Sequence, residues 1–124
     1  MLDIKNHNSF LKCLDDKDFW LLFSDTSKFV NDFKLNFHYY GIDKPTIIFF
    51  LTYVRYAKIN LIIESGIGPG FSTFYLHKFS RKFNIKVFSI EAYGLNRAFW
   101  EIPEKEDYFN LVRGNGIYEI PKII

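Results

Sequence analysis

The chain has 124 residues, of which 48% are hydrophobic, 20% aromatic and 24% charged, and its formal net charge is +2. This length suits one domain with a modest core, and the apolar fraction excludes a wholly disordered chain. The near balance of basic and acidic residues argues against a nucleic-acid partner, which needs a concentrated basic face. The single cysteine, Cys13, cannot form an intramolecular disulfide and favours a reducing, cytoplasmic setting.

The N-terminal part of the chain is predicted to be helical. Residues 1–58 carry apolar residues at roughly helical spacing. Within this region a helix is expected to follow Asp43 as its N-cap, with Pro45 in the first turn, and to end near Ala57. Its apolar residues surround nearly the whole helix, so we expect it to be covered on more than one side. The sequence does not decide whether residues 1–58 form a cap or lid, helices that pack onto the domain, or an oligomer face.

No segment of the sequence has the pattern of a membrane or secretion signal. The longest apolar run, residues 46–54, falls well short of the ~20 residues that a transmembrane helix needs. The first ten residues lack the apolar core of a signal peptide. We therefore expect no membrane partner.

From residue 59 onward the pattern changes to alternating strands and helices. Strands are predicted at residues 61–65, 85–91 and 108–113, and helices at 71–83, 94–102 and from Gly116. The first strand, LIIES, is a continuous apolar run, as expected of a parallel strand covered on both faces. This order predicts an α/β fold with a wound parallel sheet.

A glycine-rich turn, Glu64-x-Gly66-x-Gly68-x-Gly70, joins the first strand to its helix. Such a turn presents backbone N–H groups at the positive end of the helix dipole and lets a ligand approach the backbone without meeting a Cβ. A phosphate-binding P-loop is excluded, because Gly70 is followed by Phe71 where that motif needs lysine. Phe71 also disfavours the dinucleotide fingerprint, which needs a third glycine at that position.

The acidic residue followed by alternate glycines resembles the first motif of the class I, Rossmann-like S-adenosylmethionine-dependent methyltransferases. Two further segments resemble the same family in the same order. SIEA places Glu91 at the end of the second strand, where the family's acidic residue holds the ribose hydroxyls. NLVRGNGIYEIPKII resembles the segment after the third strand, where a Gly-Asp pair lies beside the adenine. Here the pair is Gly114-Asn115, a departure from the usual aspartate.

The resemblance covers about residues 45–124 and implies S-adenosylmethionine as the cofactor. It implies that Glu91 accepts from the ribose hydroxyls and that N–H groups between Gly68 and Ser72 face the methionine carboxylate. Glu64 could hold the ammonium group, directly or through water. Asn115 would meet the adenine edge, although Gly-Asn-Gly is also ordinary turn chemistry. The expected cofactor-binding residues are Glu64, Gly66, Gly68, Gly70, Ser72, Glu91 and Asn115.

The resemblance also implies that the fold is incomplete. The family's sheet continues past the third strand, and its fourth strand usually supplies catalytic residues. The expected order 3-2-1 leaves strand 61–65 with one unpaired edge. We therefore expect residues 59–124 to form the N-terminal half of a cofactor-binding domain behind the helical region 1–58. Catalytic residues would then lie outside these 124 positions, or else a second copy or a partner would cover the edge.

The leading hypothesis is thus the S-adenosylmethionine-binding half of a methyltransferase whose acceptor is a small molecule or saccharide, with a truncated methyltransferase-like protein that works with a partner as one alternative. Three further alternatives stay open: a non-catalytic S-adenosylmethionine or nucleoside-binding module that works with a partner, a nicotinamide-dependent enzyme, and an interaction protein with a degenerate fold.

The remaining polar and aromatic candidates are interpreted as structural residues. His77 is expected on the surface and His38 partly buried, with a lid or substrate role for His38 as the minor alternative. Asp15, Asp16 and Asp18 are expected at a helix start rather than around a metal, and Trp20 and Trp100 in packing.

Overall fold

The computed structural model describes residues 8–9, 11–13, 16–34, 44–67, 70–92 and 105–124. Several predicted features lie outside these residues: the helix at 94–102, the cap at Asp43, His38, Gly68 and Trp100. The described helices are α2 (Lys17–Lys34), α3 (Lys44–Tyr56), α4 (Phe71–Phe83) and α5 (Gly116–Ile123), and the described strands are β1 (Leu61–Ser65), β2 (Lys86–Glu91) and β3 (Phe109–Arg113).

The described strands form a parallel sheet in the order β1-β2-β3, which confirms the predicted α/β class and strand order. In the register, Glu64 of β1 stands opposite Ser89 of β2, and Glu91 at the end of β2 stands opposite Arg113 of β3. Because all strands run the same way, their carboxyl ends lie at one edge of the sheet. The turns that follow these strands are therefore neighbours in space.

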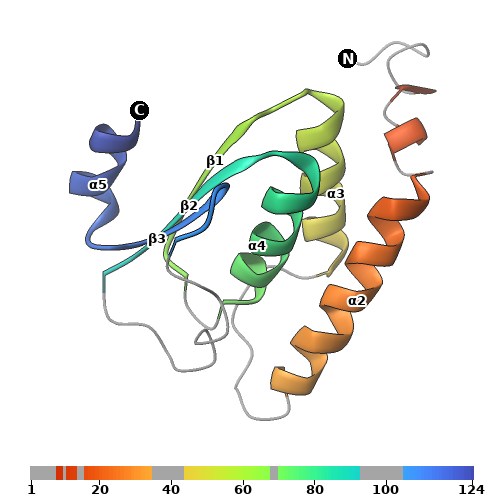
Figure 1. The fold of residues 1–124 in the computed structure, drawn as a ribbon, viewed down its shortest axis with the longest axis horizontal. Coiled ribbons are helices and arrows are strands. Elements are labelled where there is room, and N and C mark those ends of the chain that lie inside the picture. The colour runs from red at the N-terminus through yellow and green to blue at the C-terminus, as the bar shows by residue number, and fades with distance from the viewer. Residues whose placement is uncertain (1–7, 10, 14–15, 35–43, 68–69, 93–104) are drawn as a thin grey trace.

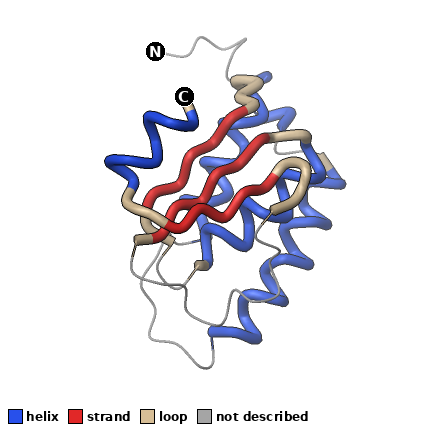
Figure 2. Tube along the Cα trace, turned by 60° about the vertical axis from the view of Figure 1, so that its left-hand side comes forward, coloured by secondary structure: helices blue, strands red, loops and turns tan. Residues whose placement is uncertain are grey.

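The helices lie on both sides of the sheet (Figure 1). Helix α4 packs against β2 and β3 on one face, and α2 and α3 pack against α4. The turned view shows the sheet with these helices behind it and α5 apart from them (Figure 2). Helix α5 contacts β2 and has no fully buried residue, so its face of the sheet is covered more thinly.

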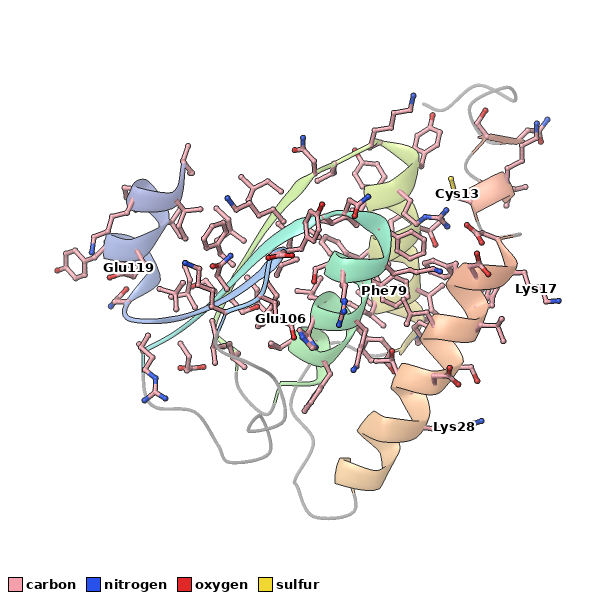
Figure 3. The ribbon with its side chains drawn as sticks, viewed as in Figure 1. Cys13, Lys17, Lys28, Phe79, Glu106 and Glu119 are labelled. Carbon is pink, nitrogen blue, oxygen red and sulfur yellow. The ribbon has the colours of Figure 1, made fainter. Side chains whose placement is uncertain are left out.

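Aromatic side chains dominate the core between the sheet and the helices. Phe19 of α2 and Phe79 of α4 are both fully buried, and their ring centroids lie 5.1 Å apart in an edge-on arrangement. Figure 3 shows Phe79 between α4 and α2. Phe23 stacks on Tyr75 at 5.0 Å, and the Tyr75 hydroxyl forms a 2.7 Å hydrogen bond with Ser27. Each such buried aromatic side chain contributes about 1.5–3 kcal/mol through burial. The N-terminal helix α2 is thus an integral part of the domain core.

Helix α2 begins at an aspartate, as predicted. The Asp16 Oδ1 atom accepts from the backbone N–H groups of Asp18 at 2.9 Å and Phe19 at 3.3 Å, which is the geometry of an N-cap. The other Asp16 oxygen pairs with Arg55 of α3 at 2.5 Å. These contacts give Asp16 a structural role at the helix start, whereas Asp15 lies outside the described residues.

Helix α3 has the predicted extent, but its predicted cover on more than one side is wrong. Ile47, Leu51 and Val54 are buried, whereas Phe49 is 62% exposed and Tyr53 is 47% exposed on the opposite side. The reason is that Ile47, Leu51 and Val54 belong to the hydrophobic core, whereas Phe49 and Tyr53 lie on the side of α3 turned away from that core. Within the described part of the chain, none of the helices combines the length and the apolar character that a bilayer crossing requires.

Candidate functional site at the ends of the strands

Backbone hydrogen bonds join the turns that follow the three strands. The N–H of Gly66 donates to the carbonyl of Ile90 at 2.9 Å, and the N–H of Gly114 donates to the carbonyl of Glu91 at 3.0 Å. These bonds extend the pairing of β1 with β2 and of β2 with β3 by one residue. They bring the predicted glycine turn, Glu91 and the start of α5 to one edge of the sheet.

The glycine turn adopts backbone conformations that favour glycine. Gly66 has φ +84° and Gly70 has φ +87°, both in the left-handed region. The N–H of Gly70 donates to the carbonyl of Ile67 at 2.9 Å, which closes the turn directly before α4. A Cβ placed on Gly66 would meet no atom within 4 Å. Gly66 therefore borders open space, as a backbone that receives a ligand must.

Glu64 lies at the end of β1 and ties the strand to the first turn of α4. The Ser72 hydroxyl donates to its Oε2, and the Thr73 hydroxyl donates to its Oε1 at 2.6 Å. Ser72 was predicted at the site, but its hydroxyl serves Glu64. Thr73 is not among the predicted site residues, although its position next to Ser72 in the first turn of α4 could have indicated a contact with Glu64. Glu64 is thus held in a fixed orientation by two hydroxyl donors.

Burial raises the pKa of the Glu64 carboxyl above its ordinary value of 4.5. The hydroxyls of Ser72 and Thr73 act in the opposite direction, and Ser89 of β2 adds to their effect although its Oγ forms no hydrogen bond within the described structure. The negative charge of Glu91 raises the pKa further. Two carboxylates therefore share this end of the sheet, and their mutual repulsion favours a cation between them.

Glu91 at the end of β2 faces the glycine turn. Its Oε2 accepts from the backbone N–H of Ile67 at 2.8 Å, and its Oε1 accepts from the N–H of Ala92 at 3.0 Å. The first bond crosses from β2 to the turn after β1 and fixes the carboxylate beside Gly66. The predicted neighbourhood of Glu91 and the glycine turn is therefore present in the structure.

The N-terminus of α4 points its first backbone N–H groups toward the same region. Gly70 precedes this helix, and no side-chain hydrogen bond caps it. The first N–H groups of a helix have no partner within the helix and carry its positive dipole end. The site thus combines two carboxylates with the uncapped N-terminus of a helix, which suits a ligand that carries both a positive and a negative group.

Asn115 begins helix α5, and its side chain acts as the helix cap. Its Oδ1 accepts from the N–H of Ile117 at 3.0 Å. The neighbouring Gly116 lies against β1, because a Cβ placed on it would come within 2.5 Å of the Ser65 Oγ. The start of α5 therefore lies beside the end of β1. These contacts show Asn115 in the local structural role that its Gly-Asn-Gly setting allows. A contact between Asn115 and adenine stays a prediction.

His77 is buried, so its predicted surface position is wrong. Only 7% of the residue is exposed, its Nε2 lies 3.2 Å from the Oε2 of Glu106, and its ring meets Phe109 edge-on at 5.0 Å. Helix α4 is covered by α2 on one side and by β3 on another, so the side of α4 opposite Tyr75 is also internal. Helical periodicity cannot reveal that second cover.

Comparison of the chain with models of protein families, with curated proteins and with solved structures found no match in any of the three. The function must therefore be argued from the contacts at this site.

Proposed function

We propose that the chain binds S-adenosylmethionine at the carboxyl ends of β1 and β2, as part of a methyltransferase of Rossmann-like architecture. One observation carries the proposal. Glu64 and Glu91, at the ends of adjacent parallel strands, flank a glycine turn in which Gly66 borders open space. The order of strand, glycine turn, helix, strand and carboxylate supports the same assignment.

Each charged or hydrogen-bonding part of this ligand has a chemically suitable partner at the site. Glu91 would accept from the ribose hydroxyls, since a carboxylate offers about four acceptor positions and two backbone donors orient it here. The backbone N–H groups at the start of α4 would hold the methionine carboxylate. Glu64 would attract the ammonium group, and the two negative charges together would favour the positively charged sulfonium. No phosphate is needed, which agrees with the lack of a P-loop lysine after Gly70.

The methyltransferase reaction would require residues beyond the described sheet. Among the described strands β1 pairs only with β2, and Leu61 at its start is 38% exposed although it is apolar. We infer that a further strand covers this edge, from the same polypeptide, a second copy or a partner. The groups that hold the methyl acceptor would come from that addition. A small molecule or saccharide remains the proposed acceptor.

Isothermal titration calorimetry with S-adenosylmethionine, S-adenosylhomocysteine, NAD and ATP tests the proposal. The two adenosyl ligands should bind, whereas NAD and ATP should not displace them from the strand-end site, because the turn lacks a group that neutralises phosphate. Glu91→Gln keeps an acceptor but removes the charge, and it should weaken S-adenosylhomocysteine binding roughly 10- to 100-fold. Asp25→Asn, at an exposed position on α2, is the matched control and should leave the affinity unchanged.

Circular dichroism of each variant separates a lost ligand contact from a lost fold. A folded wild-type protein that binds neither adenosyl ligand would refute the proposal. Equal affinities for wild type and a folded Glu91→Gln variant would remove Glu91 from the site. NAD binding stronger than that of the adenosyl ligands would favour the nicotinamide alternative.

A further inference from the structure

A second candidate site lies along α4, away from the glycine turn. A cavity of about 370 Å³ is lined by Leu22 of α2 and by His77, Lys78, Arg81 and Lys82 of α4. An adjacent cavity of about 390 Å³ shares Arg81 and is lined by Glu106, Asp107 and Tyr108. His77 is six residues beyond Phe71, or about 9 Å along the helix axis, so the cavity is separate from the proposed cofactor site.

His77, which lines this cavity, carries one polar atom without a partner in the described part of the chain. Its side chain is 9% exposed, and its Nε2 lies 3.2 Å from the Glu106 carboxylate. That contact assigns the proton of the neutral ring to Nε2 and leaves Nδ1 as the acceptor. The Nδ1 atom is buried and has no hydrogen-bond partner within the described structure. A buried polar atom without a partner is costly.

The charges around His77 explain which ligand suits it. Burial lowers the pKa of His77; the Glu106 carboxylate opposes this, and Lys78 and Arg81 lower the pKa further. Leu22 from α2 and Phe109 from β3 contribute no charge. A negative group in the cavity would offset the repulsion among the three cations of α4. It would also favour a second proton on His77, which would turn Nδ1 from an unused acceptor into a donor.

We propose that the cavity between α2 and α4 binds a small oxyanion, which is held by Arg81 and the two neighbouring lysines and is further attracted by the charge of protonated His77. The ligand class is a phosphate, sulfate or carboxylate group of a small molecule. Arg81 offers the planar fork that matches such a group, and Lys78 and Lys82 add charge. Glu106 keeps the ring oriented, because its carboxylate accepts from Nε2 in both protonation states of the imidazole.

The proposal requires anion binding and proton uptake to be linked. The anion prefers protonated His77, so its affinity is highest below the pKa of the unliganded ring. The affinity falls as the pH rises through the interval between the unliganded and the liganded pKa. If the anion raises that pKa by one unit, the affinity changes about tenfold across the interval.

Sulfate is the suitable probe, because its charge is constant between pH 5 and pH 8. Titration of the full chain with sulfate, followed by NMR of ¹⁵N-labelled histidine, should shift the His77 Nδ1 resonance and raise its apparent pKa. The dissociation constant of sulfate should increase by about tenfold as the pH rises through the same interval. His77→Gln retains a donor for Glu106 but cannot titrate, so its sulfate affinity should be weaker and independent of pH.

Two further variants distinguish sulfate bound in the cavity from a general attraction of sulfate to positive charges on the protein. Arg81→Gln should abolish the sulfate-induced shift of His77. Lys28→Gln removes the same charge from the outer side of α2, where Figure 3 shows Lys28 pointing away from α4, and should change nothing. The proposal is overturned if sulfate leaves the wild-type His77 resonances unshifted, or if Arg81→Gln and Lys28→Gln weaken sulfate equally. S-adenosylhomocysteine affinity is measured in parallel and should not depend on either variant.

Discussion

Replacement of Glu64 by glutamine tests the electrostatics of the strand-end site directly. Burial and the charge of Glu91 raise the pKa of Glu64 above 4.5 in the folded chain. A carboxyl with a raised pKa holds its proton more tightly in the folded than in the unfolded state. Its contribution to stability is therefore fully present below pH 4.5 and is lost as the pH rises through the folded pKa. At neutral pH the ionised Glu64 destabilises the fold.

The size of the effect follows from the shift and the two hydroxyl bonds. Each unit by which the pKa is raised costs about 1.4 kcal/mol of unfolding free energy once the group is ionised. Glu64→Gln does not ionise, and like the protonated carboxyl at pH 4 it has one carbonyl oxygen that can accept from Ser72 or Thr73. Only the ionised carboxyl accepts fully from both hydroxyls, and that gain is already part of the pKa shift. The two proteins should therefore be equally stable at pH 4 to within about 0.5–1.5 kcal/mol, the value of one hydrogen bond, and wild type should lose stability relative to the variant as the pH rises to 8.

Urea unfolding of both proteins at half-unit steps from pH 4 to pH 8 measures this difference. Asp25→Asn, an exposed carboxyl on α2, should show no comparable trend against wild type. A Glu64→Gln difference that stays constant with pH would refute the raised pKa. A difference that grows in favour of wild type with rising pH would mean that the hydroxyl donors outweigh burial and hold the carboxyl ionised.

Three further substitutions test parts of the fold that position the site. Gly66→Ala should lower the unfolding free energy by about 1–2 kcal/mol, because φ +84° strains a residue with a Cβ although the space beside it is open. In thermal unfolding, Asp16→Ala should destabilise by about 1 kcal/mol more than Asp16→Asn, since asparagine still caps α2 while both variants lose the charge that meets Arg55. Tyr75→Phe should cost about 0.5–1.5 kcal/mol in urea unfolding through the lost bond to Ser27, and Ser27→Ala should add little in the double variant.

The order of the described strands and helices from β1 to α5 could be predicted from the sequence because each signal is local. The apolar run at 61–65 ends at a glycine turn, and the helix at 71–83 follows with its own periodicity. Parallel strands place their carboxyl ends together, so the strand order alone predicts that Glu64 and Glu91 lie at one site. The order of the strands determines that Glu64 and Glu91 are neighbours, so this prediction does not depend on any side-chain contact.

The contacts that depend on the packing of distant segments could not be predicted in the same way. The sequence predicts a surface position for His77 because Tyr75 and Phe79 lie on the other side of its helix, but Phe109 of β3 and Glu106 contact His77 on that side as well. For α3 the error was the reverse, because residues predicted to be buried are exposed. Its apolar residues suggested burial all round, yet Phe49 remains exposed. The hydrophobic periodicity of a helix shows which of its residues are apolar, but it does not show which other segments pack against them.

The hydroxyl contacts of Glu64 change what its role at the proposed site can be. Sequence reasoning assigned Glu64 to the ligand, whereas in the structure it anchors the first turn of α4 to β1. The two roles are compatible, because each carboxylate oxygen has a second lone pair that a hydroxyl donor leaves unused. A ligand ammonium would bond to the ionised form and lower the pKa that burial raises. Ligand binding should therefore release a proton near that pKa, and saturating S-adenosylhomocysteine should flatten the pH dependence of stability that Glu64 causes in the unliganded chain.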